Sequence, residues 1–280
     1  MMRFAANLPG FLGCTFVLGL ILGYCGTVRA AGEAEHAPVH DWSWTGLFGT
    51  YERASAQRGL QVYVEVCAAC HGLNLVAYRN LADLGYTPEA IKAFASGFER
   101  AGEPDDTGQE TVRPSVPADR FVEPFANPQE ARYANNGALP PDLSLMVKSR
   151  AHGEGGFLTN LRHMLGARGS ASGADYVYAL LTGYGPKPDD LVMGEGMSYN
   201  QYFPGGQIAM AAPLYDDLIE YADGTPATVE QMSHDVTTFL AWTAEPKLEQ
   251  RKQMGLSVML FLVFLLLLTV ATKRRIWGHL

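Results

Sequence analysis

The sequence predicts a mainly α-helical protein with long irregular loops and one transmembrane helix near the C-terminus. Apolar residues recur at helical spacing in several segments, and few segments show the alternation of a strand. A run of 20 residues without a formal charge, from Gln253 to Thr272, matches the thickness of the bilayer core. The chain has 280 residues, 48 % of them hydrophobic, so it is long and apolar enough to bury a core.

The N-terminus has the pattern of a secretory signal peptide. Arg3 precedes an apolar stretch of 15 residues, Phe11 to Cys25, and Val28 and Ala30 are the small residues before a cleavage point. An uncleaved membrane anchor is the alternative, but this stretch is shorter than the roughly 20 residues that span a bilayer as a helix. We therefore expect residues 1–30 to be removed and the chain that follows to be exported.

The exported part should begin with an irregular arm and a long helix. Residues 31–50 contain His, Gly and Trp without a helical period, which indicates an extended arm. Helical spacing then runs from Tyr51 to Gly72, where glycine is expected to end the helix. One face of this predicted helix carries Leu60, Val64, Cys67 and His71.

Further helices are expected later in the chain. Short helices are predicted over 143–151 and 176–182. The residues Thr228-Val-Glu-Gln231 match a capping box, and the helix that they begin should stop before Pro246. The stretches rich in Gly and Pro are expected to form mostly irregular loops: residues 97–141 and residues 186–213.

The uncharged run near the C-terminus should span the membrane. Lys273-Arg274-Arg275 follows it directly, and Trp277 lies at the depth where indole rings settle. A buried core helix is the alternative. The length of the run and the basic residues directly after it favour a membrane-spanning helix instead. Because proline suits the first turn of a helix, we expect this helix to begin near Lys247, just after Pro246.

The charge of the chain disfavours nucleic acid as a partner. Lys and Arg number 21 against 29 Asp and Glu, a formal net charge of -8. Removal of residues 1–30, which carry two Arg and no acid, makes the net charge -10, and setting aside the three basic residues after the span leaves -13 on residues 31–272. Such a domain attracts cationic partners. Its acids cluster at Asp105-Asp106, Asp189-Asp190, and Asp216-Asp217 with Glu220 and Asp223. The alternative to a partner-binding role is that each cluster is simply solvent-exposed surface.

The motif Cys67-Ala-Ala-Cys70-His71 carries the chemistry. In an exported protein, C-x-x-C-H is the attachment sequence for c-type haem. On a helix, Cys67, Cys70 and His71 share one face, so two thioethers and one imidazole can meet a single porphyrin. His71 would supply the proximal nitrogen to iron, and its other ring nitrogen should donate to a backbone carbonyl. The sequence therefore predicts a c-type cytochrome domain with one haem c.

Other uses of these cysteines are less consistent with the sequence. A thioredoxin-like redox pair would sit in a βαβ unit, and no strand pattern precedes Cys67. A zinc site needs more ligands, but Cys14 and Cys25 leave with the signal peptide. Among the remaining histidines only His36 and His40 have a ligand-like spacing, and they more simply belong to a polar arm. A lone disulfide between Cys67 and Cys70 would be rarer still.

The sixth ligand of iron decides between an electron carrier and an open haem. Methionine opposite histidine raises the reduction potential, which suits an electron carrier. Met210 is the best candidate from local chemistry, because Gly205-Gly206 and Pro213 frame it in a loop where backbone can approach a porphyrin closely. Met146 and Met197 come next. The other methionines outside the signal peptide are Met164, Met193, Met232, Met254 and Met259.

Five segments of the sequence resemble the cytochrome c1 family. They are Arg58–His71, Ala134–Leu143 with its continuation to Arg150, Asp175–Tyr178 with Leu180–Tyr184, Tyr199–Gly205 with Ile208–Leu214, and Glu245–Gly255. The resemblance extends from about Trp44 to the C-terminus. The haem motif alone indicates only a c-type cytochrome, whereas the segments together are specific for this family.

The resemblance implies a haem site and its residues. The methionine of the Ala-Met-Ala-Ala-Pro segment, Met210, would be the axial ligand opposite His71. It also implies haem-pocket roles for Asn135 and Pro141. The resemblance further implies a haem-propionate contact for Arg150, for which a surface salt bridge is the alternative, and a place for Tyr176 nearby.

The resemblance also implies a function, a location and partners. The chain would be the haem subunit of ubiquinol–cytochrome c oxidoreductase, the cytochrome bc1 complex, and by itself only an electron carrier. It would take one electron from the Rieske iron–sulfur protein and pass it to a soluble, cationic cytochrome c, with its C-terminal helix beside cytochrome b in the lipid bilayer. The short signal points to a bacterial inner membrane. The expected organisation is a signal peptide over 1–30 and a periplasmic haem domain over 31–250. A single transmembrane helix over 251–273 and a cytoplasmic tail over 274–280 follow.

One departure from the family pattern and two rival functions accompany this expectation. Residues 152–173 contain an insertion between Arg150 and Tyr176 relative to mitochondrial relatives. The first rival function is a membrane-anchored haem subunit of a terminal oxidase. It is disfavoured by the 139 residues that separate His71 from Met210 and by the lack of a second haem motif. The second is a gas sensor or peroxidase with an open haem face.

Overall fold

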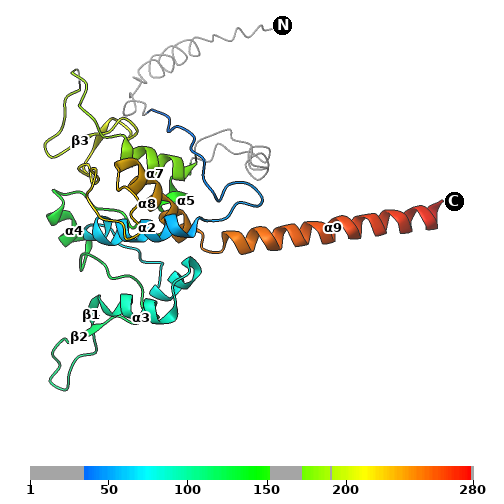
Figure 1. Cartoon of the computed structure of the whole chain (residues 1–280), viewed down its shortest axis with the longest axis horizontal. Coiled ribbons are helices and arrows are strands. Elements are labelled where there is room, and N and C mark those ends of the chain that lie inside the picture. Colours follow the sequence, from blue (N-terminus) through cyan, green and yellow to red (C-terminus); the bar gives the residue numbers. More distant parts are fainter. Residues whose placement is uncertain (1–34, 152–171, 190, 279–280) are drawn as a thin grey trace, which may run out of the picture. The chain divides into compact units, whose positions relative to one another are not determined.

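The computed structural model describes residues 35–151, 172–189 and 191–278 (Figure 1). The predicted signal peptide, Cys14 and Cys25, nearly all of the insertion over 152–173, and Asp190 lie outside the described residues. The α-helices are α2 (Arg53–Glu65), α3 (Pro88–Ser96), α4 (Pro128–Ala134), α5 (Met146–Ser149), α7 (Gly173–Thr182), α8 (Val229–Ala244) and α9 (Leu248–Trp277). The predicted mainly α class is confirmed.

The β-structure in the described residues is limited to two short antiparallel pairs. Strand β1 (Glu99–Ala101) pairs with β2 (Val112–Pro114), and β3 (Ser198–Tyr199) pairs with β4 (Gln207–Ile208). Both pairs lie in the stretches expected to be loops, which are otherwise irregular apart from α4. The prediction of long loops there is therefore confirmed in its main point.

Helices α2 and α8 pack against each other and form the centre of the core (Figure 1). A Cβ added to Gly59 would lie 2.0 Å from the carbonyl oxygen of Asp235, so the two backbones meet at this glycine. Tyr63 of α2 faces Phe239 of α8 with their ring centroids 5.8 Å apart, and Trp242 stacks on Phe239 at 5.7 Å. Full burial of each such ring contributes about 1.5–3 kcal/mol of hydrophobic stabilisation.

Helix α2 ends earlier than the spacing predicts. The helix stops at Glu65, and Val66 has φ −120° and ψ −59°, outside the α region. A short 3-10 turn, η1 (Cys67–Ala69), then carries the first part of the motif. The expectation of one helix through Gly72 is therefore wrong in its last two turns.

Two helical segments that were not predicted from the sequence lie just before the first of these loops. They are the 3-10 helix η2 (Tyr78–Leu84) and α3. The Thr87 hydroxyl accepts a hydrogen bond from the backbone N–H of Ala90 at 3.2 Å, and Pro88 occupies the first turn. Threonine followed by proline is a recognised helix start, so the sequence itself contained the signal for α3.

The later helices lie near their predicted positions. Helix α7 begins at Gly173 rather than at residue 176, because Ser172 and Asp175 form a capping box there. Helix α5 occupies only part of the predicted stretch. Helix α8 begins after Thr228, whose hydroxyl accepts from Gln231 N at 3.2 Å, and ends at Ala244, before the proline, as predicted.

The arm before α2 has no regular structure but is packed against the core. Trp42 and Trp44 are buried and stack on each other, with ring centroids 4.8 Å apart. The indole N–H of Trp42 and the backbone N–H of His40 both donate to one oxygen of the buried Asp175 carboxylate, each at 2.8 Å. The start of α7 thus holds the arm in place.

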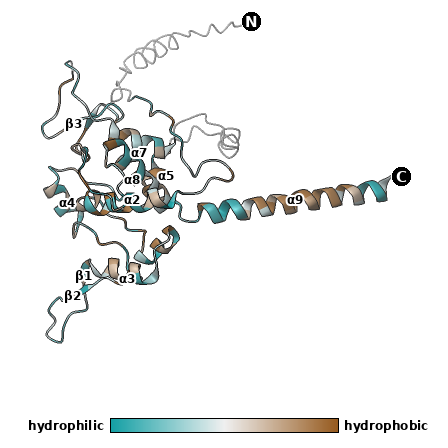
Figure 2. Ribbon diagram, viewed as in Figure 1, coloured by the Kyte–Doolittle hydropathy of each residue, from teal (hydrophilic) through white to brown (hydrophobic). Residues whose placement is uncertain are grey.

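Helix α9 begins directly after Lys247 and runs to Trp277 without interruption. It is the one helix in the described part of the chain that is long and apolar enough to cross a membrane, and none of its apolar window is buried by the rest of the chain. Figure 2 shows the apolar centre of α9 between two hydrophilic ends. A C-terminal helix long and apolar enough for the predicted span is therefore present, and it starts where predicted.

A buried carboxylate connects α2 with α8. Asp235 is fully buried and accepts hydrogen bonds from Arg58 Nε at 2.8 Å, from Ser55 Oγ at 2.6 Å and from Gln231 Nε2 at 3.0 Å. Burial by itself would raise the pKa of Asp235. Hydrogen bonds with His234 and these three side chains outweigh burial and lower the pKa to about 2.

We expect Asp235→Asn to lower the free energy of unfolding by about 3 kcal/mol, because Arg58 is largely buried and loses its charge partner. Since the folded-state pKa of Asp235 lies below that of the unfolded chain, its contribution is full above about pH 4 and is lost as pH falls toward 2. Urea unfolding followed by circular dichroism, near neutral pH and again near pH 3, measures both effects.

Asp223→Asn is the control for this prediction. Asp223 is the other charge partner of Arg58, and the Asp223 side chain is 47 % exposed. Its replacement should therefore lower the free energy of unfolding much less. An Asp235→Asn protein as stable as the parent at neutral pH would contradict the assigned role of the buried pair.

Candidate functional site

The Cys67-Ala-Ala-Cys70-His71 motif forms a compact turn at the end of α2. The backbone N–H groups of Cys70 and His71 both donate to the carbonyl of Cys67, at 3.1 and 2.9 Å. Both thiols are free of any disulfide. Burial raises the pKa of the Cys67 thiol to about 12, with a further rise from Cys70, so this sulfur is held in its neutral form.

The imidazole of His71 is oriented by one hydrogen bond. Its Nδ1 lies 2.7 Å from the carbonyl oxygen of Pro141. A carbonyl only accepts, so Nδ1 carries the proton and Nε2 keeps its lone pair available for a metal. Burial lowers the pKa of His71 more than the Pro141 carbonyl and the Asp142 carboxylate raise it, which favours the neutral form of the ring.

The segment that carries Pro141 lies along the residues that follow His71. Leu143 N donates to Gly72 O at 2.9 Å, and Asn74 N donates to Asp142 Oδ2 at 2.7 Å. These bonds fix the Pro141 carbonyl relative to the imidazole. A residue about 70 positions away in the chain therefore sets the tautomer of His71.

Tyr63 of α2 supports the same turn from the core side. Its hydroxyl donates to the carbonyl of His71 at 3.0 Å. Burial raises the pKa of Tyr63, and nearby Cys67, Glu123 and Asp142 raise it further, so the hydroxyl remains a donor. Neither Tyr63 nor Asp142 was singled out from the sequence, because no motif or spacing marks either residue as part of the site.

Asn135 lies where α4 ends, shortly before Pro141. Its Nδ2 donates to the carbonyl of Ala131 at 2.7 Å, and the next residue, Asn136, has φ 52°. This side chain therefore bonds to its own helix and stabilises the turn that leads to Pro141. Within the described residues, no hydrogen bond joins Asn135 to His71. Asn135 is linked to the His71 side of the site only because it lies six residues before Pro141 in the chain.

Met210 lies two residues after the β3–β4 pair, half-buried. The hydroxyl of Tyr184 donates to the backbone carbonyl of Met210 at 3.1 Å. Gly205 and Gly206, with φ 81° and 71°, make the turn between the two strands, a conformation that favours glycine. The backbone at Met210 is thus held by a tyrosine from the segment just after α7.

Arg150 and Tyr176 lie in the same neighbourhood as Tyr184. Burial raises the pKa of Tyr176, and the Arg150 cation opposes that rise, which places the guanidinium near the phenol. Burial also raises the pKa of Tyr184, with an added contribution from Tyr176. Tyr184, which sequence reasoning did not assign, therefore bonds to the Met210 backbone and lies within electrostatic reach of Tyr176.

The loop that carries Met210 reaches the loop that leads to Pro141. A Cβ added to Gly196 would lie 3.6 Å from Nδ2 of Asn136. The stretch 186–213 and the turn after α4 are therefore neighbours at this point.

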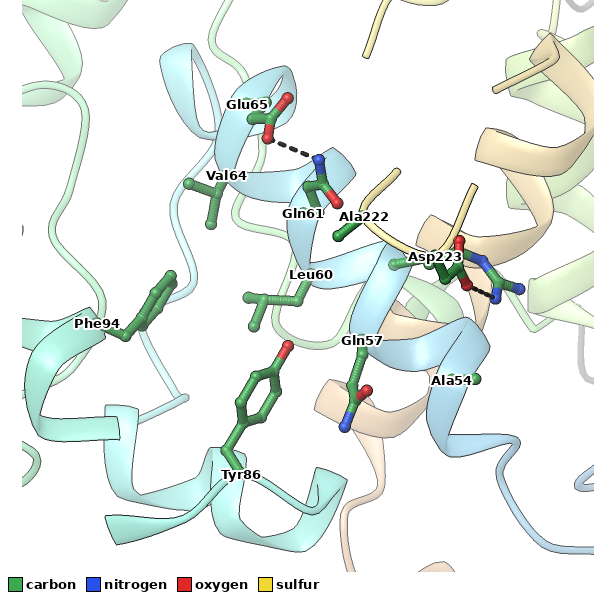
Figure 3. Close-up of a pocket in the computed structure, with 11 residues that line it drawn as sticks. Ala54, Gln57, Leu60, Gln61, Val64, Glu65, Tyr86, Phe94, Ala222 and Asp223 are labelled. Carbon is green, nitrogen blue, oxygen red and sulfur yellow. Dashed lines mark hydrogen bonds and ion pairs between the residues drawn. The ribbon is translucent and has the colours of Figure 1, made fainter. Parts of the chain in front are cut away.

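A separate surface cavity of about 350 Å³ lies beside α2. Figure 3 shows Leu60 and Val64 on α2 facing Tyr86 and Phe94 across it, with Asp223 at its far end. The cysteines, His71 and Met210 do not line it. The cavity is therefore distinct from the candidate site.

The donor set at the motif fits a covalently held haem. Two free thiols and an imidazole with an available Nε2 lie within one turn, and the imidazole is neutral and oriented. The flanking segments expose the apolar side chains of Leu75, Leu139 and Leu145, a surface that a porphyrin can cover. Within the described residues no group of three or more His, Cys, Asp or Glu side chains is placed to hold a bare metal ion.

Comparison with known proteins gives consistent matches along the chain. A family profile described as "Cytochrome C1 family" matches residues 42–280. A Bradyrhizobium diazoefficiens protein named "Cytochrome b/c1" is 45 % identical over 269 residues, which are 92 % of this chain but only 38 % of that protein. "Cytochrome c1, heme protein, mitochondrial" of Saccharomyces cerevisiae is 47 % identical over 252 residues, 90 % of this chain and 75 % of the relative. "Cytochrome c1" of Rhodospirillum rubrum is 41 % identical over 275 residues, 92 % and 94 % of the two chains.

Proposed function

The chain belongs to the cytochrome c1 family, the haem subunit of the cytochrome bc1 complex, and from this premise we propose how it carries electrons. It accepts one electron from the Rieske iron–sulfur protein and passes it to a soluble cytochrome c. The observation that supports this most strongly is the oriented, neutral His71 beside Cys67 and Cys70. The chain makes no bond of its own and acts as one subunit of ubiquinol–cytochrome c oxidoreductase.

In this proposal, Cys67 and Cys70 would hold one haem c covalently, and His71 and Met210 would bind its iron. When bound, the haem supplies a metal that changes valence by one electron. The residues of the chain hold the ligands still. The Pro141 carbonyl fixes the His71 tautomer, and the Tyr184 hydroxyl holds the backbone of Met210. These bonds would restrict the movement of His71 and of the Met210 backbone while the haem changes valence.

The remaining predicted residues have supporting roles. The Arg150 guanidinium, exposed just after α5 and within electrostatic reach of Tyr176, would bind a haem propionate in this proposal. Asn135 stabilises the turn before Pro141, and its haem-pocket role would follow from the family resemblance. These assignments follow the family resemblance, and the proximity of Arg150 to Tyr176 supports them.

The helix α9 is a single-pass membrane anchor. In the arrangement that we propose, residues 1–30 are a cleaved signal peptide and residues 31–250 form the haem domain on the periplasmic side of a bacterial inner membrane. Residues 251–273 then cross the bilayer, and 274–280 are cytoplasmic. The apolar window of α9 supports the span. The predicted signal peptide gives the orientation, because Lys247, Arg251 and Lys252 before the span equal in number the three basic residues after it.

Cytochrome b and the Rieske protein are the membrane partners in this proposal. The Bradyrhizobium relative is named for both b and c1, and this chain covers only 38 % of it. Purification of the tagged full chain from membranes in a mild detergent tests the assignment. We expect cytochrome b and a Rieske protein to co-purify with it, and recovery of the haem protein without either one would refute membership of the complex.

Electron delivery should depend strongly on salt. The region 31–272 carries a net charge of -13, which steers a cationic cytochrome c toward it. Raising ionic strength from about 0.01 M to about 1 M shortens the Debye length from about 30 Å to about 3 Å. We expect the second-order rate of cytochrome c reduction to fall by roughly tenfold or more in stopped-flow measurements.

A small uncharged electron acceptor provides the control for the salt dependence. Its reduction should change little over the same range of salt. A rate with basic cytochrome c that is equally insensitive to salt would contradict electrostatic steering by the acidic domain.

A further inference from the structure

The loop from Ser43 to Thr50 is attached to the first turns of α9. The Lys252 ammonium donates to the carbonyls of Trp44 at 2.6 Å and Gly49 at 3.0 Å. Immediately after the loop, the backbone N–H of Tyr51 donates to Oε1 of Glu249 at 2.9 Å. Bonds on both sides of the loop tip therefore hold the loop at one level of the helix.

The tip of this loop carries apolar side chains that the rest of the protein leaves exposed to different degrees. Gly46 has φ 74°, and a Cβ on Gly49 would lie 2.0 Å from Thr45 O, so the turn is tight and depends on glycine. Between these glycines, Leu47 is half-buried and Phe48 is 79 % exposed. A rigid turn that displays phenylalanine toward the outside exposes apolar surface at a defined place.

That place is where α9 enters the bilayer. Lys252 is the last charged residue before the uncharged run from Gln253 to Thr272, whose 20 residues rise about 30 Å, the thickness of the hydrocarbon core. Leu47 and Phe48 line a small cavity of about 110 Å³ together with Lys252, Gln253 and Leu256. The loop tip therefore lies at the level of the first turn of the span.

We propose that Leu47 and Phe48 insert into the boundary between lipid headgroups and acyl chains, as a second membrane contact beside α9. The tip is continuous with the membrane-spanning surface, since it shares a cavity with Leu256 of the span. The tip itself carries no charge, and the charged groups beside it are already paired: Arg53 with Glu249, and Lys252 with the carbonyls of the loop. An uncharged apolar tip whose neighbouring charges are paired fits the boundary between headgroups and acyl chains.

A contact beside the helix has a mechanical consequence. A domain held by one helix can rotate about the helix axis, whereas a second contact away from that axis resists the rotation. The loop would thus help to fix the orientation of the haem domain above the membrane. This inference rests on the membrane anchor of the proposed function and is independent of electron transfer.

Spin labelling of the full holoprotein in phospholipid nanodiscs tests the inference. Haem consumes Cys67 and Cys70, so Phe48→Cys introduces a site for a nitroxide label, with the unsubstituted protein as background. Phe48 is mostly exposed, so its replacement leaves the core intact. We expect collisions of the label with oxygen, which concentrates in lipid, to exceed collisions with a water-soluble nickel chelate.

Two labels at other exposed positions calibrate the result. Leu260→Cys lies within the span and is 63 % exposed, and Val112→Cys lies on β2 and is 65 % exposed. Position 48 should resemble 260 rather than 112. A label at 48 that prefers the chelate, as at 112, would overturn the inference, and so would a label shielded from both reagents, which would mean a protein partner. A water-accessible label at 260 would instead refute the membrane anchor itself.

Discussion

Replacement of both Cys67 and Cys70 by alanine removes all covalently bound haem from the chain. These two side chains are the free thiols of the described residues, and haem attachment requires a sulfur that adds to each vinyl group. The oriented His71 imidazole remains, but an axial bond alone does not survive denaturation. Haem staining of denaturing gels, set against an immunoblot for the amount of chain, measures the loss.

Ala69→Ser is the matched control for the double cysteine variant. Ala69 lies between the two cysteines and is exposed, so a hydroxyl there changes neither the turn nor the thiols. It should retain full haem staining. Haem that stays bound to the denatured double variant would show that attachment occurs elsewhere.

Met210→Leu should leave one coordination position of the haem iron without a protein ligand and lower the reduction potential of the haem. Leucine fills much the same volume but has no sulfur to donate, so the ferrous protein should bind carbon monoxide readily, whereas the parent resists it. The potential should fall by a sizeable fraction of the roughly 0.8 V range that axial ligands cover. Carbon monoxide difference spectra and a redox titration measure the two effects.

The other methionines weighed as ligands provide controls for this substitution. Met197→Leu removes a sulfur from the same long loop, and Met146→Leu removes one at the start of α5. Both variants should keep a high potential and a closed haem. If either binds carbon monoxide while Met210→Leu does not, Met210 is not the axial ligand.

The elements with strong local signals were predictable from the sequence. Thr228 and Pro246 bound α8, and α9 begins just after Lys247, because caps, proline and an apolar run act within a few residues of the boundary. The end of α2 was not predictable in the same way. Its apolar spacing continues through the motif, yet the backbone leaves the α region at Val66.

The candidate site was predictable where one short segment carries it. Cys67, Cys70 and His71 follow from the motif alone. Pro141 came only from the family resemblance, since nothing in its spacing shows that its carbonyl reaches His71 Nδ1. Tyr184 lies within a segment of that resemblance but was given no role, because its contact with Met210 depends on how the chain folds between them.

Electron flow from ubiquinol to soluble cytochrome c through the haem of this chain is the measurement that tests the proposal most directly. The purified complex is mixed with ubiquinol while the haem absorbance of this subunit is followed, and soluble cytochrome c is then added. We predict that ubiquinol reduces the haem and that cytochrome c reoxidises it, with neither step in a complex that carries the Cys67 and Cys70 substitutions. A haem that stays oxidised in the presence of ubiquinol, in a complex containing cytochrome b and the Rieske protein, would contradict the proposed function.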